Sequence, residues 1–292
     1  MDKKITTVGL FGKYQDRTVA EHILRLEEFL LGRKLKILFD QATAEHIAGA
    51  KSPARPRETI GGEIELAIVV GGDGTLLNVA RDLAPHRVPI IGVNLGRLGF
   101  LTDVQADHMT VEIGKILDGD YQTENRLLLH AEIMRKGRIV HTAIALNDVI
   151  VSKGELARMI EFETYLDGEF VHSIRGDGII ITSPTGSTAY ALSAGGPILH
   201  PALEAIAVVP VCPHTLSNRP IVFSSDSIVE ILVARIADQH AHATFDGQST
   251  FSLEDNDRVY VRRAEAEVEL LHPSGRSHFE VMRIKLHWGR KI

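Results

Sequence analysis

The sequence predicts an α/β amino-terminal domain with an open, mainly parallel sheet, followed by a β-rich, β-sandwich-like second domain. Residues 1–122 alternate between apolar runs typical of buried strands and apolar residues at helical spacing. Residues 123–273 change to a period of two and contain the hairpin signals Asp167-Gly168 and Asp246-Gly247. We expect residues 274–292 to rejoin the first domain.

The first domain is expected to open with a strand, a helix and a second strand. The strands are Ile5–Leu10 and Lys36–Phe39, and the helix between them has an apolar face formed by Val19, Ile23, Leu26 and Leu30. Residues 49–62 are rich in proline and glycine and show almost no periodic pattern. That composition predicts a mobile surface loop.

The same domain continues with apolar runs that suit parallel strands buried on both faces. Leu66–Val70 and Val88–Val93 are such runs. Two further helices are predicted, one with a face formed by Leu76, Leu77, Ala80, Leu83 and Ala84, the other by Val111, Ile113, Ile116 and Leu117. Because strands alternate with helices, the sheet is expected to be mainly parallel.

The second domain shows the alternation of strands with one buried face. Leu127–Ile133, Ile160–Leu166 and Val229–Val233 each place apolar residues at every second position. Asp-Gly pairs favour the tight turns that join antiparallel strands. Packed antiparallel sheets are therefore expected.

The composition of the 292-residue chain argues against several classes of function. A hydrophobic fraction of 44% and a charged fraction of 24% are ordinary for a soluble globular protein. The net charge of −6 argues against a nucleic-acid or acidic-membrane partner. Cys212 is the only cysteine, so no internal disulfide can form. No signal-type segment and no run of ~20 apolar residues is present, and we expect a cytoplasmic protein.

The glycine-rich turn Gly71-Gly72-Asp73-Gly74-Thr75 is the first candidate functional site. It follows a buried strand and opens a helix, at the edge of a sheet where ligands collect in open α/β folds. Glycines let a phosphate approach the backbone, and the helix amino terminus favours an anion. Asp73 would repel phosphate, so we expect it to orient and deprotonate a hydroxyl or to help hold a divalent metal. The ordinary alternative is a tight turn with Asp73 as helix cap.

Several further motifs, taken with this turn, resemble bacterial NAD kinases. The turn alone is shared with lipid kinases and phosphofructokinases, and the Walker and dinucleotide-binding patterns are absent. The distinguishing matches occur in family order between residues 65 and 220: Gly92–Leu101, Asn147-Asp148, Ser183–Tyr190 and Asn218-Arg219-Pro220. The family more commonly has Asn-Glu at the second match, so Asp148 is a shorter carboxylate here.

The resemblance implies a magnesium- or manganese-dependent kinase that transfers the γ-phosphoryl group of ATP to the 2′-hydroxyl of the adenosine ribose of NAD. Its products would be NADP and ADP. It also implies a homodimer or homotetramer. The implied catalytic base is Asp73, and the implied phosphate-binding residues are Gly71, Gly72, Gly74 and Thr75. The implied NAD-binding residues are Asp73, Gly74, Phe100, Asn147, Asp148, Arg158, Arg175, Asp177, Thr188, Ala189, Tyr190, Ser193 and Gln248.

Each of the later motifs also has an ordinary structural interpretation. Pro184–Thr188 suits a capped helix on a β-domain, because Ser187 or Thr188 can start a helix. Asn147-Asp148 as a dipeptide suits a turn. Arg175-Gly176-Asp177-Gly178 suits a salt-bridged loop. No cysteine pair and no His-Glu-x-x-His pattern is present, so no protein-held metal site is predicted.

Two rival functions remain open at the level of the sequence. A lipid kinase would share the glycine turn but needs an apolar groove for acyl chains, which nothing in the second half indicates. A non-catalytic dinucleotide-binding regulator would bind NAD without forming NADP. The sequence leaves open the acceptance of NADH, the use of polyphosphate, the preferred ion and control by NADP or NADPH.

Overall fold

The chain divides into two compact units in the computed structural model. Unit 1 comprises Met1–Asn125 and Val268–Ile292, and unit 2 comprises Arg126–Glu267. The structure describes residues 5–12, 17–96, 98–154, 159–215, 217–235 and 241–288. Among these, no helix is long and apolar enough to cross a membrane.

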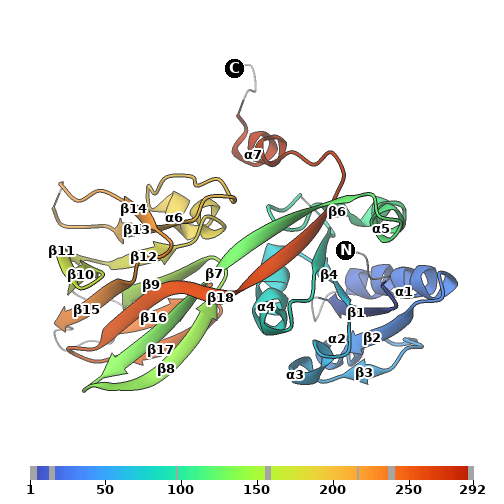
Figure 1. Cartoon of the computed structure of the whole chain (residues 1–292), viewed down its shortest axis with the longest axis horizontal. Coiled ribbons are helices and arrows are strands. Elements are labelled where there is room, and N and C mark those ends of the chain that lie inside the picture. The colour runs from blue at the N-terminus through green and yellow to red at the C-terminus, as the bar shows by residue number, and fades with distance from the viewer. Residues whose placement is uncertain are drawn as a thin grey trace. The chain divides into compact units, whose positions relative to one another are not determined.

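Unit 1 is built on a parallel sheet with helices on both faces (Figure 1). The strands pair in the order β5-β4-β1-β2-β3, and β6 and the end of β18 add to β5, all parallel. The bounds are β1 (Thr7–Gly12), β2 (Lys36–Asp40), β3 (Ala54–Arg55), β4 (Leu66–Gly71), β5 (Ile90–Asn94), β6 (Val104–Gln105) and β18 (Arg258–Pro273). This confirms the predicted parallel sheet.

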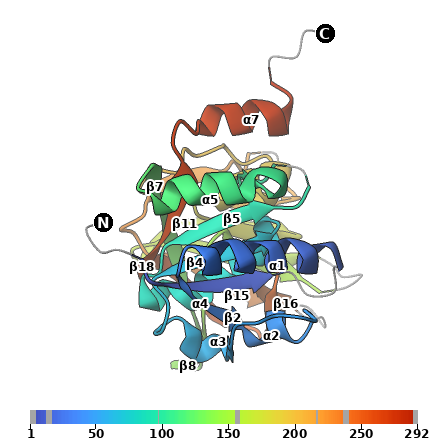
Figure 2. The same ribbon diagram turned by 90° about the vertical axis from the view of Figure 1, so that its right-hand side faces the viewer.

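Helices of unit 1 cover the sheet because each has one apolar face. Helices α1 (Arg17–Gly32) and α5 (Met109–Leu117) lie over the same face, and their buried side chains join Ile68, Val70 and Val93 in one core (Figure 2). Helix α4 (Asp73–Leu83) packs on the other face, where Leu76 lies against Gly92. The carboxyl end of the chain adds α7 (His278–Leu286) to this unit.

The segment 49–62, for which the sequence predicted a mobile surface loop, contains β3 and the short helix α3 (Arg57–Ile60). Glu27 of α1 accepts hydrogen bonds from the backbone N–H groups of Lys51 and Ser52, at 3.0 and 2.7 Å. The Arg57 side chain pairs with Asp40 at 2.8 Å, next to the short helix α2 (Gln41–Ala44). The segment is therefore not an irregular loop throughout: it contains a short strand and a short helix, and anchors supplied by distant residues leave no local periodic signal that would have predicted them.

Unit 2 consists of antiparallel strands arranged in two layers. One layer pairs in the order β14-β13-β12-β9-β16-β17, and the other contains β11-β10-β15-β18 and β7-β8. The bounds are β7 (Tyr121–Arg135), β8 (Arg138–Ala145), β9 (Asp148–Lys153), β10 (Ile160–Leu166), β11 (Glu169–Gly176), β12 (Gly178–Thr182), β13 (Ala205–Val211), β14 (Ile221–Ser224), β15 (Val229–Arg235), β16 (Ala241–Phe245) and β17 (Ser249–Leu253).

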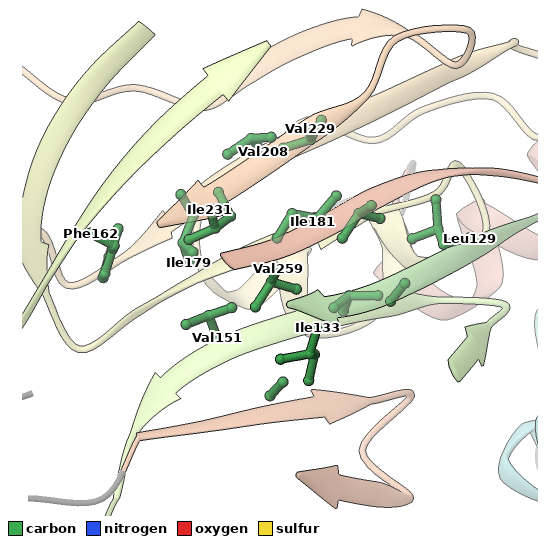
Figure 3. Close-up of a cluster of buried hydrophobic side chains, with 14 of the residues drawn as sticks. Leu129, Ile133, Val151, Phe162, Ile179, Ile181, Val208, Val229, Ile231 and Val259 are labelled. Atoms are coloured by element: carbon green, nitrogen blue, oxygen red, sulfur yellow. The ribbon is translucent and has the colours of Figure 1, made fainter. Parts of the chain in front are cut away.

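The core of unit 2 lies between these layers. Figure 3 shows Val151, Ile179 and Ile181 of one layer facing Phe162, Ile231 and Val259 of the other, and all six belong to one buried cluster. Both predicted Asp-Gly pairs form hairpin turns: Asp167, Gly168, Asp246 and Gly247 all have positive φ angles. The predicted fold class, an α/β unit with a parallel sheet and a β-rich unit, is confirmed.

Candidate active site

The turn between β4 and α4 presents backbone rather than side chains. Gly71 is buried, and a Cβ atom there would lie 2.7 Å from Thr75 Oγ1, so the tight turn requires glycine. Gly72 and Gly74 are exposed, and a Cβ atom on either would meet nothing within 4 Å. Gly72 is the N-cap of α4, so Asp73 is not the cap and its side chain has another role. The amino terminus of α4 is thus open to a bulky anion.

The Asp73 carboxylate binds the segment that follows β5. Its Oδ2 atom accepts from Phe100 N at 2.9 Å, and Oδ1 accepts from Leu101 N and Thr102 N at 3.1 Å and from Thr102 Oγ1 at 3.0 Å. A Cβ atom on Gly99 would lie closer than 3.0 Å to Asp73 Oδ1, so glycine is needed for this approach. Charge-assisted bonds of this kind hold a carboxylate in one orientation.

One acceptor position of Asp73 remains for a ligand. A carboxylate offers about four lone-pair sites, two on each oxygen. Among the described residues, Oδ2 accepts only the Phe100 N–H group. Because Asp73 is only partly buried, a ligand hydroxyl can donate to Oδ2.

In unit 2, a second carboxylate organises the Asn147-Asp148 motif. Asp246 Oδ1 accepts from Asn147 N at 2.7 Å and from Asp148 N at 3.2 Å, and Oδ2 accepts from Leu146 N at 3.0 Å. The Asp148 carbonyl accepts in return from Asp246 N at 3.0 Å. These bonds hold the backbone of the motif against the turn between β16 and β17.

The Asn147 carbonyl is held from its other side by the motif after β12. It accepts from Ser183 N at 2.9 Å and from Thr182 Oγ1 at 3.1 Å. A Cβ atom on Gly186 would lie closer than 3.0 Å to both Asn147 O and Thr182 Oγ1. The two motifs, 35 residues apart at Thr182 and Asn147, therefore form one cluster.

Gly186→Ala is expected to destabilise unit 2 by about 2–3 kcal/mol, because the added methyl group has to displace backbone and a buried hydroxyl. Gly32→Ala is the matched control, since a Cβ atom there meets nothing within 4 Å. Denaturant unfolding of both variants measures the difference. Equal stabilities for the two variants would contradict the close packing at Gly186.

The Asp148 carboxyl is buried, with 3% of the residue exposed. Burial and, to a smaller extent, the negative charge of the neighbouring Asp246 together raise the pKa of this carboxyl from 3.8 to about 7. Carboxyl groups with perturbed pKa values next to exposed polar groups are typical of functional sites. The two carboxyl groups of Asp148 and Asp246 therefore suit a ligand that donates hydrogen bonds or carries positive charge.

The chain matches known families over most of its length. Residues 8–121 match the model described as "ATP-NAD kinase N-terminal domain", and residues 146–273 match "ATP-NAD kinase C-terminal domain". The chain belongs to the NAD kinase family. The resemblance to bacterial NAD kinases that the sequence motifs indicated is confirmed.

Individual NAD kinases and related structures are similar over the full length. The NAD kinase of Thiobacillus denitrificans is 49% identical over 286 residues, which cover 98% of both chains. The crystal structure of yeast NADH kinase complexed with NADH has a TM-score of 0.91 at 21% identity, covering 100% of this chain and 90% of the yeast chain. That of an NAD kinase from Archaeoglobus fulgidus in complex with ATP has a TM-score of 0.75 at 26% identity, covering 96% and 99%.

The NAD kinase motif at residues 183–190 forms a 3-10 turn (Gly186–Thr188) and the short helix α6 (Tyr190–Ser193). Ser187 is buried and bonds Pro184 O and Leu199 N, so its role is structural. Thr188 Oγ1 donates to Thr185 O at 3.2 Å, and Ala189 N donates to Gly186 O at 2.9 Å. Tyr190 is 46% exposed and Ser193 is also exposed, so both side chains are accessible to a ligand.

The other predicted NAD-binding residues lie in different parts of unit 2. Gln248 is exposed, two residues after Asp246 in the turn that holds Asn147. Asp177 pairs with Lys153 at 2.6 Å rather than with Arg175, so the predicted salt-bridged loop uses another cation. Arg158 lies outside the described residues.

Arg175 and Asp177 are not brought together with the Asn147-Asp148 motif. In the pairing of β9 with β12, Ser152 lies opposite Gly178, whereas Asp148 lies opposite Thr182. Four strand residues separate these positions, or roughly 13 Å at the usual rise of ~3.3 Å per residue. The two groups therefore occupy opposite ends of the strand pair.

Sequence reasoning missed the residues that hold the predicted ones. Thr102 and Asn94 belong to the Asp73 site, since Asn94 Nδ2 lies 3.3 Å from Thr102 Oγ1. Asp246 was interpreted only as part of a turn. The Asp-Gly pair was a usable signal, but its partners are 98–100 residues away in the chain.

Proposed function

We propose that this NAD kinase phosphorylates the 2′-hydroxyl of the adenosine ribose of NAD, with Asp73 as the general base. The observation that carries this proposal is the Asp73 carboxylate, which four donors hold in place while Oδ2 retains an acceptor position. A ribose hydroxyl is too weak an acid to ionise in advance, so its proton has to leave as attack proceeds.

The transfer exchanges one phosphorus–oxygen bond for another. The ribose oxygen attacks the γ-phosphorus of ATP while its proton passes to Asp73 Oδ2. The bond between the γ-phosphorus and the bridging oxygen breaks, and ADP leaves with the electron pair. General-base assistance of this kind contributes typically ~10²–10⁴-fold, and most of the remaining acceleration comes from positioning and charge neutralisation.

The donor phosphates are proposed to bind at the start of α4. Gly72 and Gly74 are exposed there without side chains, and the helix amino terminus carries the positive end of its dipole. Gly71 shapes the turn and Thr75 supplies a partly buried hydroxyl. Among the described residues, no group of three or more His, Cys, Asp or Glu side chains could hold a metal ion. We propose that Mg²⁺ or Mn²⁺ enters with the ATP phosphates and neutralises their charge.

The acceptor is proposed to bind the cluster formed by the two motifs of unit 2. Asn147 and the buried Asp148 suit the hydroxyls of a ribose, and the exposed Tyr190 ring suits stacking on a base. We propose four further NAD contacts in these motifs and the neighbouring turn after β16: Thr188, Ala189, Ser193 and Gln248. Arg175 and Asp177, at the other end of β9 and β12, suit a more distant part of the dinucleotide. We also propose that Phe100 contacts NAD. The protein is further proposed to assemble as a homodimer or homotetramer and to be located in the cytoplasm.

A coupled assay tests the function. Purified protein with NAD, ATP and Mg²⁺ is expected to form NADP, detected with an NADP-specific dehydrogenase, and omission of ATP should abolish the signal. Diacylglycerol in place of NAD is expected to give no phosphorylated product. Binding of NAD without any NADP would instead indicate a regulator, and phosphorylation of the lipid would indicate a lipid kinase.

A further inference from the structure

A buried charged cluster joins the carboxyl end of the chain to the segment that binds Asp73. We call it the Arg276 cluster; it comprises Asp103, Glu124, His272 and Arg276, all in unit 1. Arg276 Nε lies 2.5 Å from Asp103 Oδ2, and Arg276 Nη1 donates to Glu124 Oε2 at 2.9 Å. The side chains of Asp103, His272 and Arg276 are 6%, 2% and 9% exposed, so the cluster is largely shielded from water.

The third nitrogen of the guanidinium group reaches the backbone next to Asp73. Arg276 Nη2 donates to the Phe100 carbonyl at 2.8 Å, and the N–H group of the same residue donates to Asp73 Oδ2 at 2.9 Å. Phe100 is therefore held between Arg276 and Asp73. Its ring is also contacted by α7, where Lys285 Nζ lies 5.7 Å from the ring centroid.

His272 closes the cluster by bridging its two carboxylates. Nδ1 lies 2.8 Å from Asp103 Oδ2, and Nε2 lies 3.1 Å from Glu124 Oε2. Asp103 directly follows Thr102, whose N–H and hydroxyl groups both bind Asp73. The segment 100–103 is thus bound by Asp73 on one side and by Arg276 and His272 on the other.

From this arrangement we infer that Arg276 is a positioning residue: by fixing the segment 100–103, it fixes the direction of the Asp73 carboxylate toward the acceptor hydroxyl. The inference rests on the proposed function of Asp73. The planar guanidinium group meets three different groups at once: Nη1 and Nη2 donate hydrogen bonds to Glu124 and to the Phe100 carbonyl, and Nε lies at ion-pair distance from Asp103. Lysine keeps the charge but cannot meet all three. Burying such a cluster costs desolvation, which a purely structural contact at the surface would avoid.

Unit 2 offers a closely matched control in Arg135. Its guanidinium also joins two carboxylates and one carbonyl: Asp257 and Glu254 at 2.7 Å, and Ser252 O at 3.0 Å. The three bonding partners of Arg135, which are Glu254, Ser252 and Asp257, are not predicted site residues. Arg135→Lys and Arg276→Lys therefore remove the same kind of fork.

The test compares steady-state kinetics and melting temperatures of the two variants. Arg276→Lys is expected to lower kcat for NADP formation by ~10–10²-fold, the scale expected from misplacing a reacting group by about 1 Å, while KM for ATP stays at the wild-type value. Arg135→Lys is expected to lower the melting temperature similarly and to keep the wild-type kcat. Wild-type kcat in folded Arg276→Lys would overturn the inference and leave the proposed function intact, whereas wild-type protein that forms no NADP would overturn both.

A second comparison shows whether Arg276 acts through Asp73. Thr102→Val removes one donor to Asp73 Oδ1. If both residues act on the same carboxylate, the double variant loses no more kcat than the more impaired single variant. Multiplication of the two losses would overturn the inference. If Arg276→Lys does not fold, Glu124→Gln weakens the hold on Nη1 instead, with Glu254→Gln as its control, and an unchanged kcat would again overturn it.

Discussion

Asp73→Asn is expected to lower kcat for NADP formation by ~10²–10⁴-fold, because the amide cannot accept the proton of the attacking hydroxyl. The structure adds a second effect. The carboxylate accepts from Phe100, Leu101 and Thr102, and an amide nitrogen in place of one oxygen would face these donors. Hydrogen bonds to charged groups are worth ~1.5–3 kcal/mol each, so unit 1 should also lose stability.

The two effects of Asp73→Asn can be separated with Thr102→Val. That variant weakens the hold on the carboxylate but keeps the base, so its loss of kcat should be far smaller. Activity is measured well below the melting temperature of each variant, with circular dichroism confirming the folded state. Nearly equal kcat values for Asp73→Asn and Thr102→Val would remove the general-base assignment and leave Asp73 a structural role.

Asp148→Asn is expected to make unit 2 more stable at alkaline pH. Burial holds the pKa of Asp148 at about 7, against 3.8 for an ordinary aspartate. The folded state therefore keeps a proton that the unfolded state releases, and the free energy of unfolding falls as pH rises from about 4 to about 7. At 1.36 kcal/mol per pKa unit, the full cost is about 4 kcal/mol. Asparagine carries no charge, so the Asp148→Asn variant avoids this cost.

The measurement is the difference in unfolding free energy between Asp148→Asn and wild type at two pH values. The variant should gain about 3 kcal/mol relative to wild type between pH 4.5 and pH 8. Its KM for NAD should rise by ~10-fold or more, since a charged acceptor for a ribose hydroxyl is lost. A stability difference that is the same at both pH values would show that the carboxyl titrates normally.

Much of the fold could be predicted because its signals are local. The apolar run Leu66–Val70 becomes β4, buried along its whole length, and the alternation at Leu127–Ile133 becomes part of β7. The helical face at Val19 and Leu30 is buried in α1. The short elements β3 and α3 were missed, since side chains from α1 and β2 hold them in place.

The motifs of the candidate site could also be found in the sequence, but their partners could not. Asp73 binds Thr102, 29 residues away, and Asn147 binds Asp246, 99 residues away. Arg276 reaches Phe100 across 176 residues. A hydrogen bond between distant residues leaves no periodic or spacing signal in a single sequence. For this reason the carboxylate of Asp73 was expected to act only on a ligand or as a cap.

The most direct test of Asp73 as the base is a crystal structure of the protein with NAD and a non-hydrolysable ATP analogue. The 2′-oxygen of the adenosine ribose is expected within ~2.6–3.2 Å of Asp73 Oδ2, with the N–H groups of residues 100–102 still bound to the carboxylate. A 2′-oxygen beyond the reach of Asp73, even through one water molecule, would contradict it.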